Sequence, residues 1–233
     1  MLAILLSCKK TSTPAPKPID NGMIAFYPFN GNANDESGHN YQLTVKSATL
    51  TTDRFGRSSK AYSFNGIDAS MIIPKFNNAD SVDHFTISLW AKPKIESGQA
   101  FLLCLSPMAN YAHSIQFIKN SGSYESYTEI VRCVPGTSVC GIQWFDKLIP
   151  DPTDEWTHIV LGQNNSSPFL YINGQEVFSN GLHYSPISFA NGGTVGSAIS
   201  GVSGFYQGDL DDIRIYGRTL SLEEIQQLFD EKP

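Results

Sequence analysis

The closing stretch of the chain, residues 204–229, is GFYQGDLDDIRIYGRTLSLEEIQQLF. From Phe205 to Tyr216, apolar and polar residues are interleaved in the way that predicts a long β-strand. Ser221 and Glu224 then stand at the spacing of a capping box, followed by apolar residues at helical intervals. The stretch therefore predicts a β-sheet that is closed by one short helix.

Three acids, Asp209, Asp211 and Asp212, fall within four positions of this predicted strand. Half-buried carboxylates repel one another unless a cation or hydrogen-bond donors compensate them. The trio therefore predicts either a bound Ca²⁺ or an arginine partner such as Arg214. A solvated strand edge decorated with acids is the alternative interpretation.

Strand patterns recur along the rest of the chain. Residues 85–93, FTISLWAKP, alternate so that Trp90 falls on the face opposite the aliphatic row, and residues 156–161 repeat the alternation. Residues 169–178 predict a hairpin, because Asn173-Gly174 favours a two-residue type I′ turn. With polar turns between short strands and one terminal helix, the chain is predicted to be all-β.

Two further segments share their pattern with a known family. YPFNGNANDESG, residues 27–38, and FGRSSKAYSFNGIDAS, residues 55–70, resemble the first two signatures of laminin G-like jelly-roll domains, and the closing stretch resembles the third. These domains are part of the concanavalin A-like lectin/glucanase group. The resemblance spans Met23 to Phe229 and implies a two-sheet antiparallel jelly-roll sandwich with a short C-terminal helix.

Length and charge set the domain organisation and exclude one class of partner. A chain of 233 residues, 41 % of them hydrophobic, can form a single large β domain. We expect a tether over residues 1–22 and the jelly-roll domain over residues 23–233. The net charge of −6 is unsuited to nucleic-acid binding.

The first eight residues, MLAILLSC, resemble the lipobox at which bacterial lipoprotein signals are cleaved and the cysteine is acylated. Cys8 is then the lipidation site, and the lysine- and proline-rich stretch that follows predicts an extended tether. A disordered terminus without a lipid anchor is the alternative. The expected location is the bacterial cell envelope, as an outer-membrane lipoprotein on the periplasmic or external side.

Three cysteines follow Cys8. Cys133 and Cys140 flank the turn signal Pro135-Gly136, which predicts a local disulfide in an oxidising compartment, although both cysteines could equally be small buried side chains. Pairing of Cys133 with Cys104 also remains open at this point, although the sequence around Cys104 predicts a core residue.

The middle of the chain departs most from the family pattern, so we expect ligand specificity to lie there. Aromatic rings among Ser, Asn and Gly suit stacking on sugars, with hydrogen bonds from the polar neighbours. Aromatic residues in β-rich chains also fill ordinary cores, which is the alternative. The candidate ligand-binding residues are Trp144, Tyr111, His113, Tyr124 and Tyr127.

The family resemblance also implies calcium. Members of the fold group often bind a structural Ca²⁺ near the meeting of the first and last strands, through side-chain and carbonyl oxygens. The matching positions in this chain are Asn30, Asp35, the Gly66 carbonyl, and either Asp211 or Asp212, according to the register of the strand. We expect such an ion to join the two ends of the domain.

Catalytic motifs are missing from the sequence. It contains no Glu-x-Asp as in glucanases of this fold, no G-x-S-x-G, no H-E-x-x-H and no phosphate-binding G-K-[ST]. The resemblance thus predicts a non-catalytic module that binds a carbohydrate or glycoconjugate. A surface adhesion module that recognises protein, and an unusual glycoside hydrolase, are the alternatives.

Overall fold

The computed structural model describes residues 19–77, 81–94, 98–108, 111–119, 126–133, 140–146, 154–165, 167–179, 187–188, 191–198 and 203–233. Within these ranges, only the backbone is described for residues 81–82, 98–99, 178–179, 187–188 and the strand residues between 106 and 146.

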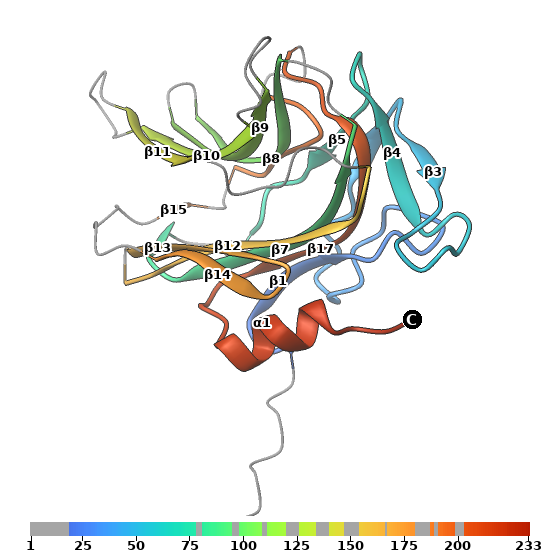
Figure 1. The fold of residues 1–233 in the computed structure, drawn as a ribbon. Coiled ribbons are helices and arrows are strands. Elements are labelled where there is room, and N and C mark those ends of the chain that lie inside the picture. The colour runs from blue at the N-terminus through green and yellow to red at the C-terminus, as the bar shows by residue number, and fades with distance from the viewer. Residues whose placement is uncertain are drawn as a thin grey trace, which may run out of the picture.

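Two antiparallel sheets face each other in a sandwich, and one helix lies against the outside (Figure 1). This arrangement confirms the predicted jelly-roll class. Sheet A runs in the order β14 (Gln175–Ser179), β13 (Ser167–Ile172), β12 (Thr157–Asn164), β7 (Phe85–Pro93), β17 (Gln207–Tyr216), β4 (Ala61–Asn65) and β3 (Thr49–Thr51), with β1 (Met23–Tyr27) also paired to β17.

Sheet B runs in the order β11 (Cys140–Asp146), β10 (Ser126–Cys133), β9 (Tyr111–Lys119), β8 (Gly98–Met108), β16 (Gly193–Val195), β5 (Ser70–Ile73) and β2 (Thr44–Lys46). A small separate pair joins β15 (Ile187–Ser188) to β6 (Ser81–Val82). The helix α1 covers Leu222–Phe229. No helix in the described ranges is long and apolar enough to cross a membrane.

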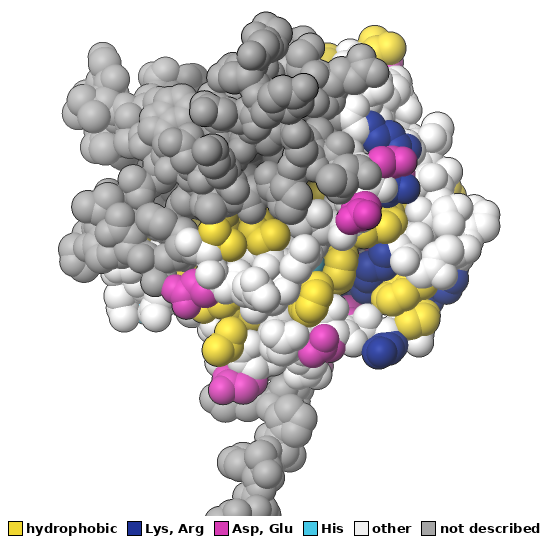
Figure 2. Space-filling model, in the orientation of Figure 1, with side chains coloured by type: hydrophobic (Ala, Val, Ile, Leu, Met, Phe, Trp, Pro, Cys, Tyr) yellow, Lys and Arg dark blue, Asp and Glu magenta, His cyan; other side chains and the backbone are white. Residues whose placement is uncertain are grey.

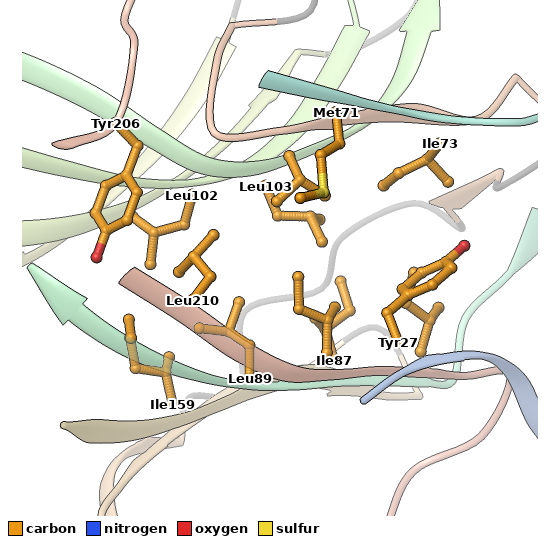
Figure 3. Close-up of a cluster of buried hydrophobic side chains, with 14 of the residues drawn as sticks. Tyr27, Met71, Ile73, Ile87, Leu89, Leu102, Leu103, Ile159, Tyr206 and Leu210 are labelled. Carbon is orange, nitrogen blue, oxygen red and sulfur yellow. The ribbon is translucent and has the colours of Figure 1, made fainter. Parts of the chain in front are cut away.

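The core lies between the two sheets. Leu210, Leu89 and Ile159 project from sheet A toward Leu102 and Leu103 of sheet B, and all five are essentially inaccessible to solvent (Figure 3). The alternation predicted for residues 85–93 is therefore confirmed, because its aliphatic row faces inward and Trp90 faces outward.

The strand β17, predicted over Phe205 to Tyr216 and observed over Gln207–Tyr216, lies between β7 and β4 within sheet A. One of its sides pairs with β7, while the other pairs with β4 through residues 207–210 and with β1 through residues 213–216. The register with β7 breaks between Asp211 and Arg214, and Asp212 has a φ of +47°. The strand thus bulges where its partner changes from β4 to β1.

The helix α1 begins as the capping box predicts. The Ser221 hydroxyl accepts the Glu224 N–H at 3.3 Å, and the Glu224 carboxylate accepts the Ser221 N–H at 2.8 Å. Leu228 and Ile225 pack against Val160 and Tyr216 on the outer face of sheet A. The Asn173-Gly174 turn, with φ of +50° and +74°, is the predicted type I′ connection between β13 and β14.

Candidate functional site

The opening and closing strands lie side by side, as predicted. In the antiparallel pair of β1 and β17, Phe26 is opposite Arg214 and Tyr27 is opposite Ile213. The acidic residues of β17 lie at this junction, where buried carboxylates need a positively charged partner or hydrogen-bond donors.

Arg54, from the loop between β3 and β4, supplies that charge. Its Nη1 atom lies 2.9 Å from the Asp211 Oδ2 and also forms an ion pair with Asp212. The side chains of Arg54 and Asp211 are only 5 % and 2 % exposed. An arginine partner was one of the two alternatives that the sequence left open. Arg214, the residue named there, also forms an ion pair, with its Nη2 atom 3.8 Å from the Asp212 Oδ1.

Aromatic rings enclose this ion cluster, which we define as Arg54, Asp211, Asp212, Arg214 and Glu231. The Arg54 guanidinium carbon lies 4.3 Å from the Phe55 ring centroid and 4.7 Å from that of Trp90. Cation–π contacts of this kind favour a desolvated guanidinium.

The other members of the cluster come from β17 and the C-terminal tail. Arg214 lies 4.2 Å from the Phe26 ring centroid and donates to both Glu231 carboxylate oxygens, at 2.8 and 3.0 Å. Trp90 in turn stacks on Phe229 of α1, at 5.9 Å between ring centroids. The helix and the tail therefore close the outer face of sheet A over the ion cluster.

The ion cluster perturbs the titration of Asp211. Burial, and next the charge of Asp212, raise its pKa to about 8, although Arg54 and the Asp212 N–H act in the opposite direction. A buried carboxyl beside a second carboxylate holds its proton because two adjacent negative charges are costly there.

Asp35, the predicted calcium ligand in the loop after β1, has backbone partners of its own. Asp35 accepts the N–H groups of Phe26, Ser37 and Tyr41 at 2.9–3.0 Å and so fixes the loop after β1. Burial alone would raise the pKa of Asp35, but these donors lower it below its ordinary value. Both Asp35 carboxylate oxygens thus accept hydrogen bonds from backbone N–H groups.

Asn30 lies in the loop after β1, and Gly66 lies in the turn after β4. Asn30 is exposed at the turn in which the Gly31 N–H bonds to the Phe29 carbonyl. Gly66 follows Asn65, which pairs with Gln207, and Asp211 lies four residues further along β17. That offset is roughly 13 Å at the rise of a β-strand.

Gly66 and Asp211 are therefore too far apart to bind one ion, because calcium ligands lie about 2.3–2.6 Å from the ion. Within the described ranges, no three His, Cys, Asp or Glu side chains form a group that could hold a metal ion. Since Arg54 already compensates Asp211 and Asp212, the geometry favours an arginine at this junction, and calcium binding stays a prediction.

A buried Ser–His pair lies close to the ion cluster, and no local sequence pattern indicates it. The Ser88 hydroxyl and the His158 Nε2 are 2.9 Å apart across β7 and β12, and both residues are fully buried. Burial, followed by the charges of Arg214 and Arg54, lowers the pKa of His158 to about 3. An imidazole that binds protons so weakly, and that no substrate can reach, is suited to packing and not to general-base catalysis.

The aromatic ligand candidates fall on two faces of sheet B. Trp144 is opposite Glu129, which is two residues from Tyr127, so Trp144 and Tyr127 share one face. Val131, on the same face of β10 as Glu129, is opposite Ser114, and Ser114 is opposite Cys104. This row lies on the face turned away from sheet A, because Leu103 and Leu105, on either side of Cys104, belong to the core.

Tyr111 and His113 belong to the opposite face by the same register. His113 pairs with Leu105, whose face is turned toward sheet A. The backbone thus separates the predicted set into Trp144 and Tyr127 on the outer face, and Tyr111 and His113 on the inner face. Tyr124 and Cys8 lie outside the described residues.

The described part of the face in Figure 2 shows no broad basic patch of the kind that binds a polyanion. Basic side chains lie on the side of the molecule where β3 and β4 run, with acidic ones beside them (Figure 2). The described part of this face therefore carries both signs of charge, in keeping with the net charge of −6.

The sequence also matches a family profile. Residues 64–226 match the profile of the concanavalin A-like lectin/glucanases superfamily. The chain belongs to this superfamily. The match begins near the end of β4 and ends within α1, so it includes β17 of sheet A and every strand of sheet B except β2.

Solved structures with the superfamily's sandwich resemble this chain over most of its length. Domain 4 of AbnA, a GH43 extracellular arabinanase from Geobacillus stearothermophilus solved with arabinotriose, has a TM-score of 0.68 at 22 % identity, covering 89 % of this chain and 98 % of that domain. The ligand-binding domain of botulinum neurotoxin serotype D, solved with N-acetylneuraminic acid, has a TM-score of 0.68 at 17 % identity, covering 91 % of this chain.

The binding domain of Paraclostridial Mosquitocidal Protein 1 also has a TM-score of 0.68, at 21 % identity. This chain spans about half of each toxin domain, 51 % of the neurotoxin domain and 52 % of the mosquitocidal one. No curated protein matches the chain. At these identities the structural likeness shows the superfamily's fold alone.

Proposed function

We propose that this superfamily member is a non-catalytic module that binds carbohydrate or a glycoconjugate at the outer face of β10 and β11. The observation that carries the proposal is the register that puts Trp144 and Tyr127 on one face of the edge hairpin. Diagonal neighbours across two antiparallel strands are about 7–8 Å apart, so two aromatic residues at this spacing can flank one sugar ring.

Polar residues share that face with the two aromatic ones. Glu129 lies beside Trp144 in the register, and Gln116 follows in the same row. Sugar sites combine an aromatic platform with a few hydrogen-bonding groups that fix orientation. Two proteins with this sandwich were solved with sugars, arabinotriose and N-acetylneuraminic acid, which supports the class of ligand.

The proposal is tested on a glycan array that includes arabino-oligosaccharides and sialosides, followed by calorimetry with the ligand that binds best. We expect Trp144→Ala to weaken affinity at least about tenfold, which corresponds to about 1.4 kcal/mol. His39→Ala is the control, because His39 is an exposed ring on the loop after β1. No binding across the array, or equal affinity of Trp144→Ala and wild type, refutes the proposal.

We further propose that the module is held at the bacterial envelope through acylated Cys8. The support is the sequence MLAILLSC and the tether that follows it. In cells, Cys8→Ser should move the protein from the membrane fraction to the soluble fraction, while Cys104→Ser should not. Retention of Cys8→Ser in the membrane fraction contradicts the anchor.

A further inference from the structure

Cys133 and Cys140 meet at the end of the β10–β11 hairpin. The register of the two strands runs without a break from Tyr127 opposite Asp146 to Cys133 opposite Cys140. Residues directly opposite in an antiparallel pair have Cα atoms about 4.5–5.5 Å apart, according to whether the pair is hydrogen-bonded. Both distances lie within the roughly 4.4–6.8 Å that a disulfide spans.

The same register excludes Cys104 as the partner. Cys104 of β8 is opposite Ser114, and Ser114 is opposite Val131, two residues short of Cys133. The strand β9 lies between them, so two strand spacings alone separate the Cα atoms by about 9.6 Å, and the offset along the strand adds to that. A disulfide cannot bridge Cα atoms more than about 7 Å apart without moving the backbone.

We propose that Cys133 and Cys140 form a cross-strand disulfide that closes the β10–β11 hairpin. The strand β11 is the edge of sheet B and has a neighbour, β10, on one side alone in the described part of the sheet. The covalent link thus fixes an edge strand of sheet B, and that strand carries Trp144. The inference does not depend on sugar binding.

The step is a two-electron oxidation. Both thiols lose their protons, one S–S bond forms between Cys133 and Cys140, and a small-molecule disulfide oxidant is reduced to two thiols by thiol–disulfide exchange. Oxidised glutathione supplies such a disulfide in the test, and the oxidising cell envelope is where such links persist.

The sequence allows a direct mass measurement. Trypsin cleaves after Arg132 and Lys147, and no Lys or Arg lies between them, so both cysteines fall in one peptide, CVPGTSVCGIQWFDK. Cleavage after Lys94 and Lys119 puts Cys104 in a different peptide. The full chain is equilibrated with oxidised and reduced glutathione, alkylated, digested and measured with and without reduction.

We expect the 133–147 peptide to be two hydrogen masses lighter than its dithiol form and to take up two alkyl groups after reduction alone. Alkylation of both cysteines in the oxidised protein overturns the proposal. So does a cross-link between the 133–147 peptide and the peptide that contains Cys104, or a disulfide-linked dimer through either cysteine. Cys133→Ser/Cys140→Ser is the matched control, and its thermal midpoint should not respond to reductant, whereas that of oxidised wild type should fall.

Discussion

Replacing Arg54 with methionine tests the account of the ion cluster. Methionine keeps much of the apolar stem between Phe55 and Trp90 but removes the charge that Asp211 and Asp212 share. Removing one partner of a buried ion pair costs about 3–5 kcal/mol, because the remaining charge stays buried without compensation. For a domain of this size that corresponds to a fall in Tm on the order of 10 °C.

Lys92→Met is the control for Arg54→Met. Lys92 also lies on the outer face of sheet A, but its ion pair with Asp154 spans 3.5 Å and the Asp154 side chain is 63 % exposed. An exposed pair of this kind contributes about 0–1 kcal/mol. Both variants replace a cationic side chain with methionine. They differ in whether the ion pair that is lost is buried, as for Arg54, or exposed, as for Lys92.

The assay is urea unfolding at roughly pH 6 and pH 9, on either side of the raised pKa of Asp211. The Arg54→Met penalty should be larger at the higher pH, where both carboxylates are ionised. Adding Asp211→Asn to Arg54→Met should recover at least about 1 kcal/mol at that pH, because one of two uncompensated charges is removed. A penalty equal to that of Lys92→Met at both pH values refutes the reasoning.

Three other predictions concern the titration of Asp211, the core and calcium. The folded-state pKa of Asp211 is about 8, against an ordinary value of 3.8. The stability that the Asp211 carboxyl contributes is therefore complete below about pH 4 and is lost as the pH rises to about 8. In urea unfolding at a series of pH values, Asp211→Asn should flatten that part of the stability profile. Leu210→Ala should lower the free energy of unfolding by about 2–5 kcal/mol, and Ile72→Thr, at a 54 % exposed position, by about 0.5 kcal/mol or less, both measured by urea unfolding. If the predicted calcium ion binds, and free Ca²⁺ is present at about a hundred times the dissociation constant, a chelator should lower the free energy of unfolding by about 2.7 kcal/mol and lower Tm. An unchanged thermal midpoint contradicts calcium binding.

The sequence by itself determined the all-β class, several of the strands and the closing helix. Alternation over residues 85–93 placed Trp90 on the face opposite the aliphatic row, and the structure has it there, 8 % exposed beneath α1. The Asn173-Gly174 turn and the Ser221–Glu224 capping box were also fully predicted. These features depend on a few neighbouring residues, so a local pattern is enough to specify them.

Only the tertiary structure decided which distant groups meet. Arg54 and Asp211 are 157 residues apart in sequence, and Ser88 and His158 are 70 apart, so no local pattern could pair them. The same holds for sheet B, where strand register put Trp144 and Tyr127 on one face, Tyr111 and His113 on the other, and Cys133 opposite Cys140 and not near Cys104. A shift of one residue in register would exchange those faces, and the register is fixed by which face is buried against the other sheet.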